Sequence, residues 1–221
     1  TSAKDANMNM IRLWGGGKFE KDAFYEICDE LGLLIWHDFM FACAFYPTDA
    51  EYFGQVTSEI THQIKRLKSH PSIAMWCGDN EGMDLLGWRF AKKDREFTLN
   101  EYKKIIDLKG RLVQALDPER LYWPSSPCGG PGDLKTNGWR DDSKGDMHLW
   151  DVSKFVRPLA DYYKFKPHFM SEFGHSCFSG NLETLEQQKE NMREKGGYEN
   201  IQERIKMHFN PKSGSAANLV Y

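Results

Sequence analysis

The chain has 221 residues, which is long enough for one domain with a sizeable buried core. Its net charge of -3 argues against a nucleic acid or an anionic membrane as a partner. No apolar run approaches the roughly 18 to 20 residues that a membrane-spanning helix needs, so we expect no membrane insertion.

The first part of the chain alternates short apolar runs with amphipathic segments. Residues Met8–Trp14 predict a strand, and Phe19–Leu31 predict a helix because their apolar positions recur at helical spacing. Residues Leu33–Trp36 predict the next buried strand. The aromatic segment Phe39–Tyr46 predicts a loop or a short helix.

The same alternation continues through the middle of the chain. Residues Glu51–Leu67 predict a helix with one apolar stripe, and Ile73–Cys77 predict a fully buried strand. A further helix is expected over Leu99–Leu116, where Asp117 and a proline end the pattern, followed by a short strand over Leu121–Trp123.

The last part of the chain contains two more predicted strands, Asp146–Trp150 and Pro167–Ser171, with a short helix over Phe155–Tyr163 between them. Beyond Gly174 the pattern weakens, and helices are expected over 182–193 and 196–209. Strands that alternate with helices at this spacing favour right-handed crossovers and a parallel sheet, which is an α/β fold.

The glycine run after the first predicted strand does not indicate a nucleotide site. Gly15, Gly16 and Gly17 follow a strand, but they do not form the spaced glycine pattern of a dinucleotide-binding turn. The five cysteines are odd in number and widely spaced, so we expect mostly buried thiols rather than disulfides or a zinc site.

Acidic residues follow two of the predicted strands. Glu81 comes after Asp79 and Asn80 at the end of the strand Ile73–Cys77, and Glu172 follows the strand Pro167–Ser171. In barrels of parallel strands, catalytic groups lie at the carboxyl ends of the strands. Two carboxyl groups at such positions are what glycoside hydrolysis requires.

Six short motifs occur in an order that is typical of one enzyme family. They are residues 9–17 (Asn-Met-Ile-Arg-Leu-Trp-Gly-Gly-Gly), 29–32 (Asp-Glu-Leu-Gly), 36–42 (Trp-His-Asp-Phe-Met-Phe-Ala), 63–71, 79–81 (Asp-Asn-Glu) and 171–174 (Ser-Glu-Phe-Gly). Together they resemble the catalytic domain of the β-mannosidases of glycoside hydrolase family 2. The resemblance covers residues 5 to 180.

The resemblance implies a (β/α)₈ TIM barrel and hydrolysis with retention of anomeric configuration. It implies that Glu81 is the acid/base after strand 4 and that Glu172 is the nucleophile after strand 7. Strands 2 to 7 are then identifiable, strand 1 is absent and strand 8 is unclear. We therefore expect residues 1–221 to be a partial, apparently incomplete barrel domain, without the N-terminal β-sandwich domains of the family.

Two residues are expected to support the glutamates. Asn80 resembles the family's amide that binds the sugar 2-hydroxyl, although a turn residue is the alternative. Arg12 ends the first strand, where it could hold Glu172 ionised and oriented, or form an ordinary salt bridge.

Five further residues are candidates for binding the substrate. Asp38 could bond a sugar hydroxyl or serve as a buried structural acceptor, and Trp150 could stack on the sugar or pack in the core. The full set lies at or after strand ends and comprises Trp14, Asp38, His148, Trp150 and Trp88. The histidines lack metal-ligand spacing, so we expect neither a metal nor a cofactor.

The function that the resemblance implies is that of a retaining exo-β-mannosidase, which removes terminal non-reducing β-D-mannose from oligosaccharides. The alternatives are an endo-β-mannosidase, another family 2 β-glycosidase, or a non-catalytic carbohydrate-binding or structural piece. The expected partners are an oligosaccharide with terminal β-mannose and the rest of the parent polypeptide. The sequence assigns no compartment, since family members occur in lysosome, periplasm or cytoplasm.

Overall fold

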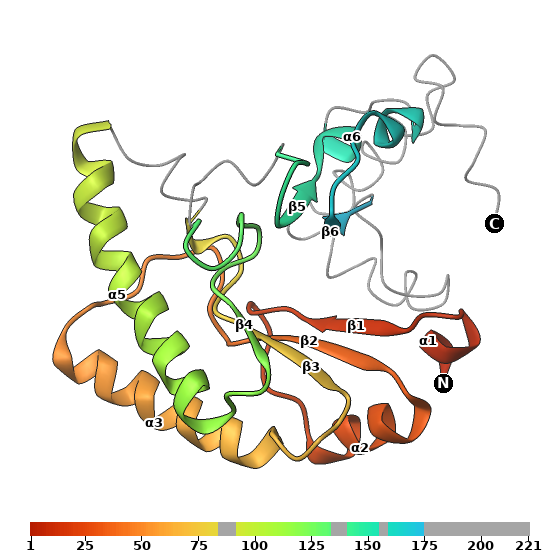
Figure 1. Ribbon diagram of the computed structural model, residues 1–221, viewed down its shortest axis with the longest axis horizontal. Coiled ribbons are helices and arrows are strands. Elements are labelled where there is room, and N and C mark those ends of the chain that lie inside the picture. Colours follow the sequence, from red (N-terminus) through yellow and green to blue (C-terminus); the bar gives the residue numbers. More distant parts are fainter. Residues whose placement is uncertain (84–91, 134–140, 155–158, 175–221) are drawn as a thin grey trace, which may run out of the picture. The chain divides into compact units, whose positions relative to one another are not determined.

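The computed structural model describes residues 1–83, 92–133, 141–154 and 159–174 (Figure 1). The chain divides into two compact units, which are described separately below. The first consists of Thr1–Met147 together with Pro167–Ser171, and the second of His148–Lys166 together with the residues from Glu172 onward.

A parallel sheet of four strands organises the first unit. Its strands are β1 (Met10–Leu13), β2 (Leu34–Asp38), β3 (Ile73–Cys77) and β4 (Leu121–Trp123), and each is hydrogen-bonded to the next strand along the chain (Figure 1). This order confirms the predicted α/β alternation and the parallel sheet. All four carboxyl ends therefore lie at one edge of the sheet.

After a short helix at the start of the chain, the described helices of the first unit connect consecutive strands. A short α1 (Ser2–Asp5), which the sequence pattern did not predict, precedes α2 (Asp22–Leu31), α3 (Ala50–Leu67) and α5 (Lys92–Leu116). Helices α3 and α5 lie side by side (Figure 1). The start of α3 is fixed by Asp49, whose side chain accepts a hydrogen bond from the third residue of the helix.

Glycine ends α2 for a conformational reason. Gly32 adopts φ 66°, in the left-handed region that glycine enters at no steric cost, and its N–H bonds back to the carbonyl of Asp29. The chain can therefore reverse at once and enter β2.

Apolar side chains of the sheet and the helices form a main core, and Trp36, Met75 and Cys77 form a second, smaller cluster. The main core contains large, fully buried side chains from β2, β3 and the inner faces of α2, α3 and α5, and from the segments that follow β2 and β3: Tyr25, Ile35, Phe39, Ile60, Ile64, Leu67, Ile73, Trp76, Met83 and Tyr102. Burial of each large side chain contributes about 1.5–3 kcal/mol relative to exposure. This core holds in place the carboxyl ends of the strands, where the candidate site lies.

Several predicted boundaries differ from the observed ones. Strand β2 continues to Asp38, so Trp36, His37 and Asp38 lie within the strand rather than partly after it. Residues 39–46 contain no helix, which settles the open alternative in favour of a loop. Helix α5 begins at Lys92, seven positions before the predicted start, because its first turns have no apolar stripe that periodicity could detect.

A second sheet consists of two strands, β5 (Asp146–Leu149) and β6 (Phe169–Phe173). Strand β6 extends past its predicted end, so Glu172 is a strand residue. Between these strands lie α6 (Asp151–Lys154) and the 3₁₀ helix η1 (Leu159–Lys164), which overlaps the end of the predicted helix 155–163. Residues 155–158, the predicted C-terminal helices, Trp88 and Cys177 lie outside the described residues.

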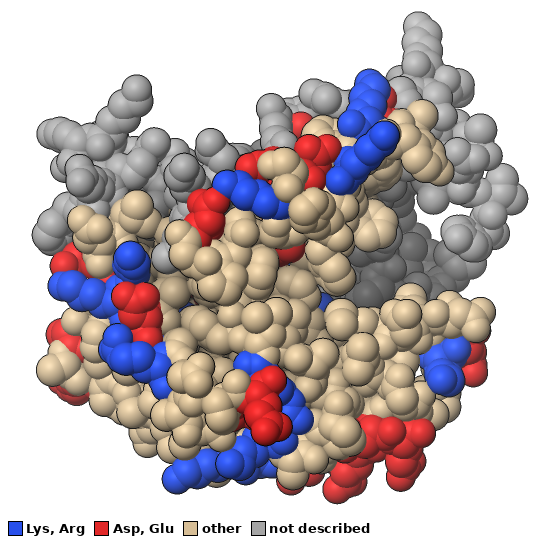
Figure 2. All heavy atoms as spheres, in the orientation of Figure 1, with Lys and Arg blue, Asp and Glu red and all other residues tan. Residues whose placement is uncertain are grey.

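Three of the four cysteines in the described part of the chain are buried free thiols, as predicted: Cys28, Cys77 and Cys128. The fourth, Cys43, is exposed. Among the described helices, none combines the length and the apolar character that crossing a bilayer requires. On the face shown in Figure 2, basic and acidic side chains are intermixed.

A buried histidine in β2 makes the fold sensitive to acid. The Nδ1 of His37 lies 2.7 Å from the Asp38 carbonyl, which can only accept, so Nε2 of the neutral ring accepts from the Tyr25 hydroxyl at 2.9 Å. Burial lowers the pKa of His37 to about 4. Between pH 6.5 and about 4, His37 therefore binds a proton in the unfolded chain but stays neutral in the folded chain.

We expect this histidine to reduce the free energy of unfolding by about 3 kcal/mol as the pH falls from 6.5 to 4. Urea unfolding of His37→Gln at pH 7 and pH 4.5 should show a smaller pH dependence than the parent protein. His62→Gln, at an exposed position of α3, is the matched control. Equal pH dependence in the parent and in both variants would contradict the assignment.

Candidate active site

The loops that follow β2, β3 and β4 are joined by backbone hydrogen bonds beyond the ends of the strands. The N–H of Asn80 donates to the Phe41 carbonyl at 2.9 Å, and the N–H of Glu81 donates to the Ser126 carbonyl at 2.7 Å. Asn80 also forms isolated parallel bridges with Ala42 and Ser126. The backbone around Asn80 and Glu81 is therefore held from both sides.

Two backbone features fix the path of the chain from β3 to Glu81. A Cβ atom on Gly78 would lie 2.1 Å from the Pro124 carbonyl oxygen, so a glycine is needed where the two loops approach. Glu81 itself adopts φ 56°, a left-handed conformation that costs a non-glycine residue about 1–3 kcal/mol. The surrounding hydrogen bonds hold it there, as is common at functional sites.

A thiol contacts the carboxyl group of Glu81. The Cys43 thiol donates to Glu81 Oε2 at 3.3 Å and receives a bond from Asn80 Nδ2 at 3.5 Å. The Cys43 N–H donates to the Asn80 carbonyl at 2.9 Å. In the sequence, Cys43 is only one of five widely spaced cysteines, and nothing in its spacing shows which loop it approaches.

The amide of Asn80 is oriented by Arg12. Nη2 of Arg12 donates to Asn80 Oδ1 at 2.8 Å and to Asp38 Oδ2 at 2.8 Å. With Oδ1 occupied by Arg12, the amide nitrogen of Asn80 points towards Cys43. Asn80 thus has a fixed orientation, and the predicted interaction of Arg12 with Glu172 stays a prediction.

Asp38 acts as a buried acceptor. Besides Arg12, its carboxylate accepts bonds from Trp36 Nε1 at 2.8 Å and from the Gly15 N–H at 3.0 Å. Burial raises its pKa, although the Arg12 guanidinium opposes this. Of the two interpretations left open by the sequence, these contacts favour the structural one. Trp14, by contrast, is 49% exposed and directly follows β1, and its role in substrate binding stays a prediction.

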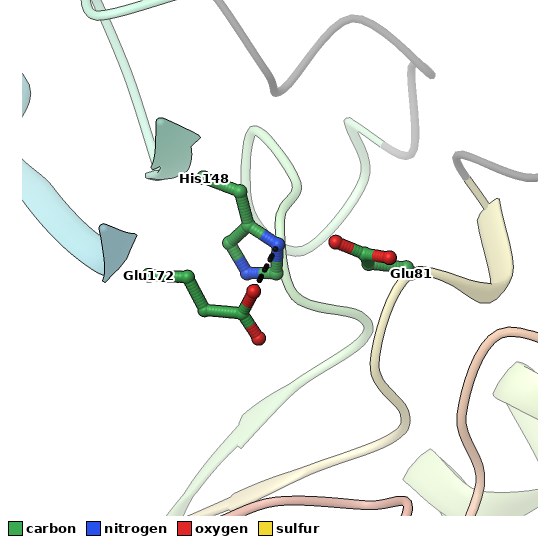
Figure 3. Close-up of side chains that lie close together, drawn as sticks. All are labelled: Glu81, His148 and Glu172. Carbon is green, nitrogen blue, oxygen red and sulfur yellow. Dashed lines mark ion pairs between the residues drawn. The ribbon is translucent and has the colours of Figure 1, made fainter. Parts of the chain in front are cut away.

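In the second unit, two side chains converge on Glu172. Nε1 of Trp150 donates to Glu172 Oε2 at 2.9 Å, and Nδ1 of His148 lies 3.3 Å from the same oxygen (Figure 3). His148 is fully buried, whereas the side chain of Glu172 is 18% exposed. The N–H of Trp150 thus orients the predicted nucleophile, and the expected stacking of its ring on a sugar stays a prediction.

The first unit contains a polar cluster that no pattern in the sequence predicts. The buried carboxylate of Asp146 accepts bonds from Ser126 Oγ at 2.7 Å, Ser171 Oγ at 2.5 Å and Trp123 Nε1 at 2.8 Å. Ser171 directly precedes Glu172 in the chain. The cluster therefore ties β5, β6 and the loop after β4 together, immediately before the predicted nucleophile.

Comparison with known proteins finds beta-mannosidases that are similar to this chain. No family model matches the chain. It is 40% identical over 197 residues to a beta-mannosidase of Bos taurus and 37% identical over 199 residues to beta-mannosidase B of Aspergillus terreus. In both cases the match covers 84% of this chain and 22% of the relative.

A solved structure shows the same relationship. The beta-D-mannosidase of Dictyoglomus thermophilum superimposes with a TM-score of 0.72 at 40% identity, over 84% of this chain and 22% of that protein. The chain thus spans a little over a fifth of the length of the relatives it matches. The resemblance inferred from the six motifs is confirmed.

Proposed function

Because the chain is related over most of its length to a part of the β-mannosidases of glycoside hydrolase family 2, we propose that it carries the catalytic residues of a retaining exo-β-mannosidase. The enzyme removes terminal non-reducing β-D-mannose from oligosaccharides. The observation that carries this proposal is the 40% identity to beta-mannosidases over 84% of the chain. The sheet edge bearing Asn80 and Glu81 supports it.

The proposed fold is a partial (β/α)₈ barrel. In this assignment, β1 to β4 are barrel strands 2 to 5, and β5 and β6 are strands 6 and 7. Four consecutive parallel strands with connecting helices support the assignment. The rest of the parent polypeptide completes the barrel.

In the first step of the proposed reaction, Glu172 attacks the anomeric carbon as a carboxylate. Glu81 gives its proton to the glycosidic oxygen, so the aglycone leaves and a covalent glycosyl-enzyme forms. The mechanism requires the two carboxyl groups about 5 to 5.5 Å apart. The bond that Glu172 accepts from Trp150 orients the attacking group, and His148 Nδ1 lies 3.3 Å from the same oxygen.

In the second step, a water molecule replaces the enzyme at the anomeric carbon. Glu81, now a carboxylate, takes a proton from the water, and the Glu172 ester is cleaved. The mechanism needs Glu81 protonated before the first step and ionised before the second. Mannose leaves with its original configuration, and both groups return to their starting forms.

Asn80, Trp14 and Trp88 bind the substrate in this proposal. Asn80, oriented by Arg12, donates from its amide to the sugar 2-hydroxyl, a contact that strengthens in the transition state. Trp14 offers an exposed ring for stacking, and Trp88 is proposed on sequence alone. Asp38 acts through Arg12 and Trp36.

A small chromogenic substrate tests the proposed function. The natural full-length polypeptide should release nitrophenol from 4-nitrophenyl β-D-mannoside, with kcat/KM at least about 100-fold above that for the β-galactoside, β-glucuronide and β-glucoside. The mannoside and its analogues differ only in the sugar, so they control for non-specific hydrolysis. Cleavage of internal mannan linkages without nitrophenol release would favour an endo enzyme, and activity on another glycoside alone would refute the mannosidase assignment.

A further inference from the structure

Helix α5 carries a lysine whose side chain is completely buried. Lys109 Nζ donates to the Gly78 carbonyl at 2.7 Å and lies 3.9 Å from Asp79 Oδ2. The ammonium also lies 4.0 Å from the centroid of the Phe41 ring, within the range of a cation–π contact. A buried charge is costly unless it is paired and hydrogen-bonded, and here both conditions are met.

The partners of this ammonium belong to the two loops that frame the candidate acid/base. Gly78 and Asp79 are the residues immediately before Asn80 and Glu81. Phe41 provides the carbonyl to which the Asn80 N–H donates. Lys109 therefore bridges the segment that leads into Glu81 and the neighbouring loop that supports it.

Asp79, which pairs with Lys109, also accepts hydrogen bonds from three other groups. Its carboxylate accepts bonds from Ser125 Oγ at 2.5 Å, from the Tyr102 hydroxyl, and from the Gly82 N–H at 3.4 Å. Gly82 follows Glu81, so the Asp79 carboxylate contacts the chain on the far side of the candidate acid/base. Within the segment Gly78–Gly82, the Asp79 carboxylate accepts from the Gly82 N–H, and Lys109 contacts both Gly78 and Asp79.

We propose that the Lys109 ammonium is a positioning group that holds the 78–82 segment and so sets the direction in which Glu81 presents its carboxyl group. The inference rests on the proposed function, because it concerns Glu81 as the proton donor. Lys109 does not touch the reacting atoms in this proposal, and acts through Gly78 and Asp79.

The protonation state of Lys109 gives the proposal a pH signature. Asp79 and Asp38 are the carboxylates that act on it, while Cys77, Tyr102 and Tyr122 stay neutral because burial raises their pKa. Burial lowers the pKa of Lys109 to about 8, and Asp79 offsets this only in part. Activity that depends on the ammonium should therefore fall as the pH rises through about 8.

The contribution of Lys109 to the free energy of unfolding should rise with pH, whereas the activity should fall. The folded pKa of Lys109 lies below its unfolded value of 10.5, so the unfolded chain binds more protons between about pH 8 and 10.5. The contribution of this group to the free energy of unfolding then rises with pH over that interval. A loss of activity near pH 8 is thus distinguishable from alkaline unfolding.

The test uses Lys109→Met in the natural full-length polypeptide and a series of aryl β-mannosides. A misdirected Glu81 cannot protonate the leaving oxygen, so kcat/KM should fall about 10-fold or more for phenols of high pKa. It should fall less than about 3-fold for dinitrophenyl mannoside, which needs no proton. Lys104→Met, an exposed lysine of the same helix paired with Glu101, should leave the whole series unchanged.

An equal loss of kcat/KM across the series, or no loss, would overturn the positioning role. If Lys109→Met fails to fold, Asp79→Asn replaces it. The same dependence of kcat/KM on the leaving group is expected, and an equal loss for all substrates would again contradict the proposal. Titration of ¹³C-labelled lysines by NMR should show one lysine near pH 8, missing in the Lys109→Met variant; a Lys109 signal titrating near 10.5 would overturn the proposal. A parent protein inactive on every mannoside would instead refute the proposed function.

Discussion

Replacing Glu172 with Gln is expected to reduce turnover of β-mannosides by about 10⁴-fold or more, because an amide cannot attack the anomeric carbon. The substitution keeps the shape of the side chain and an oxygen that can accept from Trp150, so sugar binding should persist. The measurements are steady-state kinetics with 4-nitrophenyl β-D-mannoside and calorimetric titration with mannose.

The matched control for this variant is Glu119→Gln, which makes the same chemical change at an exposed position. It should retain the kcat and KM of the parent protein. If the Glu172 variant keeps more than about a tenth of the parent activity, the nucleophile must be sought elsewhere in the polypeptide.

Replacing Glu81 with Ala should give the second largest effect. We expect kcat/KM to fall about 10²–10⁴-fold for substrates with poor leaving groups, because no acid protonates the glycosidic oxygen. With dinitrophenyl β-D-mannoside the first step should survive, and the covalent intermediate should accumulate because no base activates water. Added azide should restore turnover, since it needs no base.

The configuration of the azide product separates the two glutamates. Azide that attacks the covalent intermediate of Glu81→Ala should give β-mannosyl azide, with the configuration of the substrate retained. Azide that replaces the nucleophile in Glu172→Ala should give the inverted α-product. The opposite pairing of variants and products would reverse the assigned roles, and absence of azide rescue in Glu81→Ala would count against an acid/base role.

The strands of the first unit could be predicted because buried strands appear in the sequence as short runs of apolar residues. Ile73–Cys77 is a short apolar run that ends at a glycine, and its bounds were predicted correctly. The parallel order followed from the helices between the strands. Once this strand was predicted, its end also predicted that Asn80 and Glu81 lie at the carboxyl end of the strand.

The ends of β2 and β6 could not be predicted in this way. Asp38 and Glu172 are charged, and a charged residue normally marks the end of a buried strand. Here both belong to strands, Asp38 as the last residue of β2, because specific partners donate hydrogen bonds to them: Arg12 and Trp36 to Asp38, and Trp150 to Glu172. Such partners are distant in sequence, so periodicity cannot reveal them.

Lys109 illustrates a signal that was present but not used. It lies four positions after Ile105 and four before Val113, both fully buried, and so occupies the inner face of α5. A lysine on an apolar stripe predicts a buried charge with a specific partner. Only the structure identifies that partner as the segment that precedes Glu81.

Identification of the residue that bonds to the sugar tests the central claim most directly. A 2-deoxy-2-fluoro mannosyl fluoride slows the second step, so the glycosyl-enzyme should accumulate and be detected by mass spectrometry of the digested protein. We expect the label on the peptide that contains Glu172, with the fragment ions assigning it to that side chain. A label on any other residue, or complete turnover of the mannoside without a covalent adduct, would contradict the mechanism.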